Sequence, residues 1–138
     1  GAGALNTLGA LRNELARPAS VVFVGTFLTR STFAGLAAYI ASKAALAAQA
    51  RTLAVEFAPL GIRINIVSPG PTATAIWGTL GLSDEQFEQV AEMVGKRLLP
   101  GHFLESAAVA NVILFQLSQG ARGVYGQDWV VDNGYTLN

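Results

Sequence analysis

The sequence predicts an α/β fold in which a parallel sheet of about three strands is covered by helices on both faces, the doubly wound arrangement. Two observations support this prediction. Short apolar runs rich in β-branched residues alternate along the chain with longer helix-like stretches, and strands separated by helices favour right-handed crossovers between parallel neighbours. The run over 20–26 is also continuous rather than alternating, which is typical of a strand buried on both faces.

The first part of the chain is expected to contain two helices around one strand. Its elements in chain order are a helix over 1–17, a strand over 20–26, a loop over 27–35 and a helix over 37–58. The first helix has leucines at helical spacing and stops at Pro18, whereas the second ends before Pro59 and Gly61, both helix breakers. Alanine on nearly every side of the second helix indicates close neighbours all round.

The second part is expected to contain two strands and two helices. These are a strand over 61–68, an amphipathic helix that starts after Ser83, a helix over 105–118 and a strand over 126–132. Ser83 with Gln86 three residues later forms a capping box. The chain therefore predicts a single domain over residues 1–138, since 138 residues suffice for only one layered core.

Composition excludes several classes of function. Nine basic and nine acidic residues balance without a basic run, which argues against nucleic-acid and membrane-surface partners. The absence of cysteine fits a reducing, cytoplasmic setting, and one histidine, His102, cannot build a metal cluster by itself. The longest uncharged stretch, 64–83, contains prolines and hydroxyl residues and is no membrane span.

The surface is short of charge. Charged residues make up 13% of the chain, against about 25% in an ordinary soluble domain. We therefore expect part of the exterior to be covered by another subunit or by further polypeptide.

Tyr39 and Lys43 are the strongest candidates for chemistry. They lie four apart in a predicted helix, so their side chains share one face one turn apart. An ammonium in that place favours the phenolate, which a general acid or base needs. The spacing alone also fits a chance surface pair, but an ammonium in an alanine-packed helix is costly unless it faces a polar site.

Three blocks of the sequence, "AAYIASKAAL", "LAVEFAPLGIRINIVSPGPTAT" and "GVYGQDWVVDNGYTL", resemble the carboxyl-terminal half of a short-chain dehydrogenase/reductase. The resemblance runs from about Ser20 to the end, in order and at the family's spacing. It implies a Rossmann-like sheet, NAD or NADP as cofactor, and a small alcohol or carbonyl as substrate.

The resemblance also assigns roles by position. Tyr39 would be the catalytic acid/base, Lys43 would assist it and hold the nicotinamide ribose, and Thr26 stands where the family usually has a substrate-binding serine. The proline-glycine turn beside the nicotinamide matches Pro69 and Gly70, and the hydroxyl residues that follow it are Thr72 and Thr74. Residues from about 76 to 104 would form the variable substrate lid.

Some family features are absent or altered. The glycine-rich turn, the residue that selects the adenine ribose and the "NNAG"-like segment belong to a first half that this chain lacks. The opening "GAGALNTLGA" is no phosphate loop, because no strand precedes it. Asn6 is a weak match to the family's catalytic asparagine, since it lies about two turns too close to Thr26. Asn133 replaces a common glycine.

Other residues have structural interpretations that we prefer. His102 and Phe103 follow a proline-glycine pair and are expected to pack in a loop, Arg30 is expected in solvent, and Trp77 either lines the pocket or covers the core.

Alternative functions remain open. The chain could be a non-catalytic fragment that acts as an assembly or interaction module, or the fold could carry lyase or isomerase chemistry. The helices over 3–17 and 37–58 match segments that pair between subunits in the family, so we expect a homo-oligomer.

Overall fold

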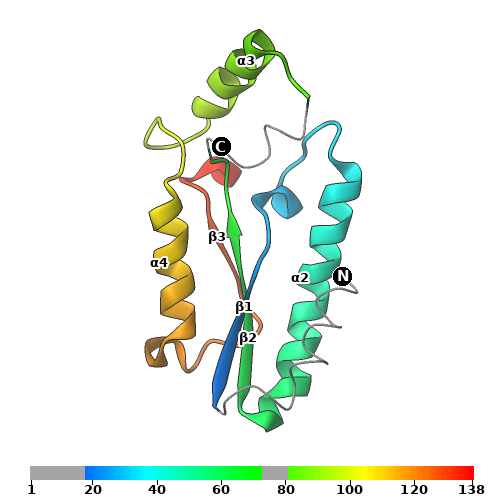
Figure 1. The fold of residues 1–138 in the computed structure, drawn as a ribbon, viewed down its shortest axis with the longest axis vertical. Helices are drawn as coiled ribbons and strands as arrows, with labels where there is room; N and C mark the ends of the chain where they lie inside the picture. The colour runs from blue at the N-terminus through cyan, green and yellow to red at the C-terminus, as the bar shows by residue number, and fades with distance from the viewer. Residues whose placement is uncertain (1–17, 73–80) are drawn as a thin grey trace.

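The computed structural model describes residues 18–72 and 81–138. Its centre is a parallel sheet with the order β1-β2-β3, formed by Ala19–Val24, Ile62–Pro69 and Asp128–Val131 (Figure 1). The register places Val24 beside Val67 and Pro69 beside Val131. All three strands therefore point the same way and end at one edge of the sheet, as the sequence predicts.

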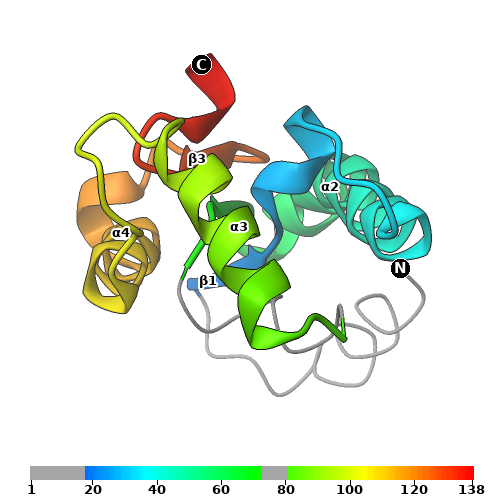
Figure 2. The same ribbon diagram turned by 90° about the horizontal axis from the view of Figure 1, so that it is seen from above.

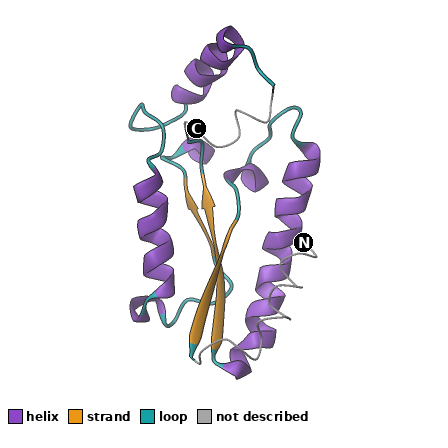
Figure 3. Ribbon diagram, viewed as in Figure 1, coloured by secondary structure: helices purple, strands orange, loops and turns teal. Residues whose placement is uncertain are grey.

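Helices cover both faces of this sheet. Seen from above, α2 (Ala37–Phe57) and α4 (Ser106–Leu117) lie on opposite sides of the strands (Figure 2). Helix α3 (Asp84–Gly95) lies beyond the carboxyl ends of the strands (Figure 3). The predicted capping box is present, because the Ser83 hydroxyl accepts a bond from the Gln86 N–H and the Gln86 side chain accepts one from the Ser83 N–H. The doubly wound prediction is confirmed.

Four short 3-10 helices complete the described structure. They are η1 (Phe27–Arg30), η2 (Ala58–Leu60), η4 (Gln119–Ala121) and η5 (Tyr135–Leu137). The predicted loop over 27–35 thus begins with a turn of helix. The amphipathic helix, expected as far as Leu98, ends at Gly95, and the other described boundaries differ from the prediction by one or two residues. The predicted helix over 1–17, with Asn6, lies outside the described residues, as do Thr74 and Trp77.

The main core joins α2 to the central strand. Ala50, Leu53 and Ala54 pack against three isoleucines of β2, and every residue from 62 to 68 is buried. Burying a side chain of this size contributes about 1.5–3 kcal/mol relative to leaving it in water. Isoleucine alternates with polar residues in β2, and the polar side chains have a role of their own. Arg63 donates to the main-chain oxygens of Gln116, Ser118 and Val124 and so holds the end of α4.

Two burial predictions are wrong. Strand β1 is only partly buried and its last residue, Val24, is exposed, because β1 pairs with β2 and no described strand pairs with its other edge. Alanines at 37, 38, 41, 44, 45 and 48 of α2 are likewise exposed. The continuous apolar run and the alanine-rich helix therefore leave apolar surface uncovered within the described residues. Among these residues no helix is both long and apolar enough to span a bilayer.

Candidate active site at the carboxyl ends of the strands

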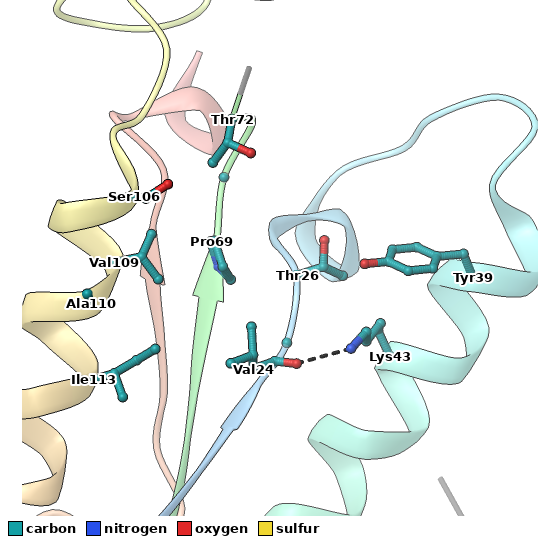
Figure 4. Close-up of a pocket in the computed structure, with 12 residues that line it drawn as sticks. Val24, Thr26, Tyr39, Lys43, Pro69, Thr72, Ser106, Val109, Ala110 and Ile113 are labelled. Atoms are coloured by element: carbon teal, nitrogen blue, oxygen red, sulfur yellow. Dashed lines mark hydrogen bonds between the residues drawn. The ribbon is translucent and has the colours of Figure 1, made fainter. Parts of the chain in front are cut away.

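A cavity of about 410 Å³ opens where β1 and β2 end (Figure 4). Its walls come from the strand ends, from the start of α2 and from α4. They are formed by Val24, Gly25, Thr26, Tyr39, Lys43, Pro69, Gly70, Thr72, Ser106, Val109, Ala110 and Ile113. This volume lies in the range of small-molecule sites, and the position beyond the carboxyl ends is where ligands bind in doubly wound sheets.

Thr26 is fixed by the turn that follows β1. Its backbone is extended, with φ −155°, and its hydroxyl oxygen caps η1 by accepting a bond of 3.3 Å from the Leu28 N–H. The side chain of Thr26 is only 3% exposed. Since the hydroxyl oxygen accepts this bond, the hydroxyl proton of Thr26 remains available for a ligand in the cavity.

Tyr39 and Lys43 reach the cavity from the first turns of α2. Figure 4 shows the Tyr39 hydroxyl pointing toward Thr26, and Tyr39 is 38% exposed. The Lys43 ammonium donates to the Val24 main-chain oxygen over 3.1 Å and lies 6.0 Å from the centre of the Tyr39 ring. This bond ties the end of β1 to α2 and holds a positive charge beside the phenol.

The turn after β2 requires glycine for a steric reason. A Cβ on Gly70 would lie 2.5 Å from the Cα of Asp132, and the Gly70 N–H donates to the Val131 oxygen over 2.8 Å. Gly25 has a similar constraint, because its Cβ would lie 2.6 Å from the Ser68 hydroxyl oxygen. Main chain packs closely at the end of β2, and side chains of β2 pack closely against the end of β1, so both glycines shape the floor of the cavity.

Asp132 anchors the segment beside this turn. Its carboxylate accepts bonds from the Gly134 N–H (3.0 Å), the Thr136 N–H (2.9 Å) and the Thr136 hydroxyl (2.7 Å). Burial acts to raise the pKa of Asp132, but these hydrogen bonds outweigh it and leave the pKa below its ordinary value. Asn133 has φ 49°, a region that asparagine tolerates, which explains how it replaces a glycine.

The wall from α4 was not found by sequence reasoning. Ser106, Val109, Ala110 and Ile113 follow the spacing of one helix face, and this spacing is the signal that could have identified them. The three apolar side chains among them give the cavity a side suited to a flat, uncharged group.

Six of the predicted site residues come together in this one cavity: Thr26, Tyr39, Lys43, Pro69, Gly70 and Thr72. His102 is exposed and does not line it, and its ring nitrogen Nδ1 lies 3.0 Å from the Phe103 oxygen. Arg30 is exposed, as expected, and donates to the Asp128 oxygen. The described residues contain no group of three side chains able to hold a metal ion.

The chain is similar to known proteins along nearly its whole length. Residues 2–136 match a family model described as enoyl-(acyl carrier protein) reductase. A 2,3-dihydro-2,3-dihydroxybenzoate dehydrogenase of Escherichia coli is 38% identical over 98% of this chain and 57% of its own length. Carbonyl reductase [NADPH] 2 of Sus scrofa is 34% identical over 86% of this chain and 47% of its own. The chain thus spans about half the length of these relatives.

Solved structures also superimpose on nearly the whole of this chain. A small-chain dehydrogenase in complex with NADPH superimposes with a TM-score of 0.84 at 26% identity, over 99% of this chain and 59% of that one. A short chain dehydrogenase family protein from Francisella tularensis gives 0.83 at 26% identity, over 98% and 58%.

Proposed function

Because the chain belongs to the short-chain dehydrogenase/reductase family, we propose that it supplies the catalytic half of a nicotinamide-dependent oxidoreductase that interconverts an alcohol and a carbonyl. The observation that carries this proposal is the convergence of Thr26, Tyr39 and Lys43 on one cavity at the strand ends. The names of the relatives support it, since they include a carbonyl reductase and dehydrogenases.

The cavity fits the nicotinamide end of NAD or NADP. Lys43 and Thr72 offer polar groups, Pro69 and Gly70 form a close-packed floor, and α4 offers an apolar wall. When bound, the cofactor supplies or accepts a hydride at the substrate carbon. Lys43 and the 69–72 turn would hold it, with Thr74 as a further proposed contact.

The side chains handle the proton and the oxygen. In the reducing direction the Tyr39 phenol gives its proton to the substrate oxygen as the carbonyl carbon gains a hydride, and the product is an alcohol. The Lys43 ammonium stabilises the phenolate that remains. Thr26 donates its free hydroxyl proton to the same substrate oxygen and so orients it. In oxidation each of these steps runs in reverse.

The test uses the protein made from the complete reading frame that contains this chain. It should oxidise NADH or NADPH in the presence of members of a panel of small ketones and aldehydes. Tyr39→Phe should lower kcat about 100-fold or more, the size of a lost general acid. Tyr125→Phe is the matched control, since Tyr125 is exposed and does not line the cavity. Equal kcat for wild type and Tyr39→Phe would contradict the proposal.

A second candidate function is a non-catalytic assembly module. Two observations favour it. No described strand pairs with the outer edge of β1, so the main-chain groups there can bond to another strand. Leu114 and Phe115 of α4 also expose apolar surface. Saturable binding of NADH to this chain, followed by fluorescence, would exclude a purely structural role.

We also propose that the protein is a cytoplasmic homo-oligomer that pairs through α2, whose exposed alanines allow close approach of another helix. Light scattering that gives a monomer mass at micromolar concentration would contradict this pairing.

A further inference from the structure

Arg97, in the turn after α3, contacts Tyr135 near the carboxyl terminus through its ring, its hydroxyl and its main chain. Its guanidinium lies 4.0 Å from the ring centre of Tyr135, its Nη1 donates to the Tyr135 hydroxyl over 3.0 Å, and its Nη2 donates to the Tyr135 main-chain oxygen over 3.4 Å. Its Nε donates to the main-chain oxygen of Asn138 over 3.1 Å, and the Asn138 amide donates back to the Arg97 oxygen over 3.3 Å. Five contacts therefore join the segment after α3 to η5 and to Asn138, the residue that follows it.

The other side of Tyr135 contacts the turn that carries Thr26. Tyr135 is 5% exposed, and its ring meets that of Phe27 edge to face with 5.1 Å between centres. Phe27 directly follows Thr26, whose hydroxyl caps the same turn. One ring thus lies between the guanidinium of Arg97 and the residue next to Thr26.

These rings belong to a second hydrophobic cluster that joins the parts of the site. Its buried members are Phe27, Leu28, Leu36, Val94, Leu98 and Tyr135, and Ile40 packs against it. Leu36 and Ile40 flank Tyr39 at the start of α2, whereas Val94 and Leu98 come from α3 and the turn after it. The cluster therefore contacts the Thr26 turn, the Tyr39 helix and the described part of the predicted lid, residues 81–104.

Tyr135 is itself held in place. The carboxylate of Asp132 binds the N–H groups of Gly134 and Thr136, the residues on either side of Tyr135. The Tyr135 N–H donates to the main-chain oxygen of Asp132 over 3.0 Å. Tyr135 is therefore restrained at its main chain as well as at its ring.

We propose that Arg97 and Tyr135 are positioning residues that hold the α3 segment at a set distance from Thr26 and Tyr39, and so fix the size of the substrate space above the cavity. The catalytic part of this statement rests on the proposed function, whereas the mechanical coupling does not. Arg97 bonds to the main-chain oxygen and the hydroxyl of Tyr135. The ring of Tyr135 in turn packs against Phe27 in the Thr26 turn.

Hydrogen exchange of the chain, followed by mass spectrometry, tests the coupling without any activity. Arg97→Met keeps an unbranched side chain but removes the donors and the charge. We expect amides of 84–95 and of 27–30 to exchange about tenfold faster in this variant, as local openings with fewer contacts do, while those of β2 stay at the wild-type rate. Lys96→Met is the control, because the Lys96 side chain forms an exposed ion pair with Glu92, and it should leave every segment unchanged.

Two variants of Tyr135 separate the two sides of the ring. Tyr135→Phe keeps the contact with Phe27 but loses the hydrogen bond between the Tyr135 hydroxyl and Arg97 Nη1, so exchange should rise in 84–95 only. Tyr135→Leu loses both contacts, so exchange should rise in 84–95 and 27–30. Wild-type exchange in Arg97→Met, or equally faster exchange in β2, would overturn the proposal, since the second result is that of a general structural role.

A kinetic measurement tests the catalytic part. In the reductase assay Arg97→Met should raise KM for the carbonyl substrate about tenfold and change kcat less than threefold, because it alters the substrate space and not the proton donor. An unchanged KM would overturn the catalytic part. If the wild-type protein shows no turnover, the proposed function fails and the exchange measurement still decides the coupling.

Discussion

Gly70→Ala offers a direct test of how the floor of the cavity is built. The new Cβ would lie 2.5 Å from both the Cα and the Cβ of Asp132, whereas carbon atoms pack at about 3.5–4.0 Å. Main chain must therefore move by about 1 Å. Asp132 cannot yield easily, because its carboxylate holds Gly134 and Thr136. The movement should instead separate the ends of β2 and β3 and weaken the bond from the Gly70 N–H to the Val131 oxygen.

The expected cost follows from three effects. Overpacking of this kind costs about 1–3 kcal/mol, and a weakened main-chain bond adds about 1 kcal/mol. Replacing glycine also lowers the entropy of the unfolded chain, which returns about 0.5 kcal/mol. We expect the free energy of unfolding to fall by about 1.5–3.5 kcal/mol.

Urea unfolding followed by far-ultraviolet circular dichroism measures this change. Gly95→Ala is the matched control, since nothing lies within 4 Å of its added Cβ and it ends α3. That variant should be as stable as wild type or more stable by up to about 1 kcal/mol. If Gly70→Ala unfolded within about 0.5 kcal/mol of wild type, the close approach to Asp132 would not constrain the turn.

Three further predictions concern single side chains. Asn65→Leu should lower the free energy of unfolding by about 3 kcal/mol, because the Val124 oxygen and the Gln127 N–H each lose a buried bond of 2.9 Å; urea unfolding within 1 kcal/mol of wild type would contradict this. Thr136→Val removes a hydrogen bond that lowers the pKa of Asp132, so the variant should be less stable than wild type at neutral pH. Stability from a lowered carboxyl pKa is present above about pH 4 and lost as pH falls through the folded-state pKa, so the difference in unfolding free energy between variant and wild type should disappear on acidification. A difference that does not depend on pH would refute the assignment. In the reductase assay Thr26→Ser should keep kcat within about tenfold, whereas Thr26→Val, which lacks the hydroxyl, should lose about 100-fold or more; equal losses would exclude a role for the hydroxyl.

The helices and strands could be predicted because each depends on local pattern. The apolar runs, the breakers at Pro59 and Gly61 and the Ser83 capping box determine where elements begin and end within one or two residues. The burial of β1 could not be predicted in this way. A continuous apolar run indicates that both faces can be covered, but only the pairing of the strands shows whether they are.

The site was predictable from its motif residues and not from its supports. Tyr39 and Lys43 lie one turn apart, and a resemblance placed Thr26 near them. The contact of Arg97 with Tyr135 joins residues 38 positions apart, and the α4 wall reaches the cavity from the far side of the sheet. Contacts of that range depend on tertiary packing, which periodicity and spacing do not encode.

The central claim is that this half of the fold receives the nicotinamide end of the cofactor beside Tyr39 and Lys43. Saturation-transfer difference NMR of NADH with this chain measures it most directly, because the method detects weak binding and reports which ligand protons touch protein. We expect the nicotinamide and its ribose protons to receive more saturation than the adenine protons, and Lys43→Met to abolish the difference. Transfer that is absent, that favours adenine, or that is unchanged in Lys43→Met would contradict the account.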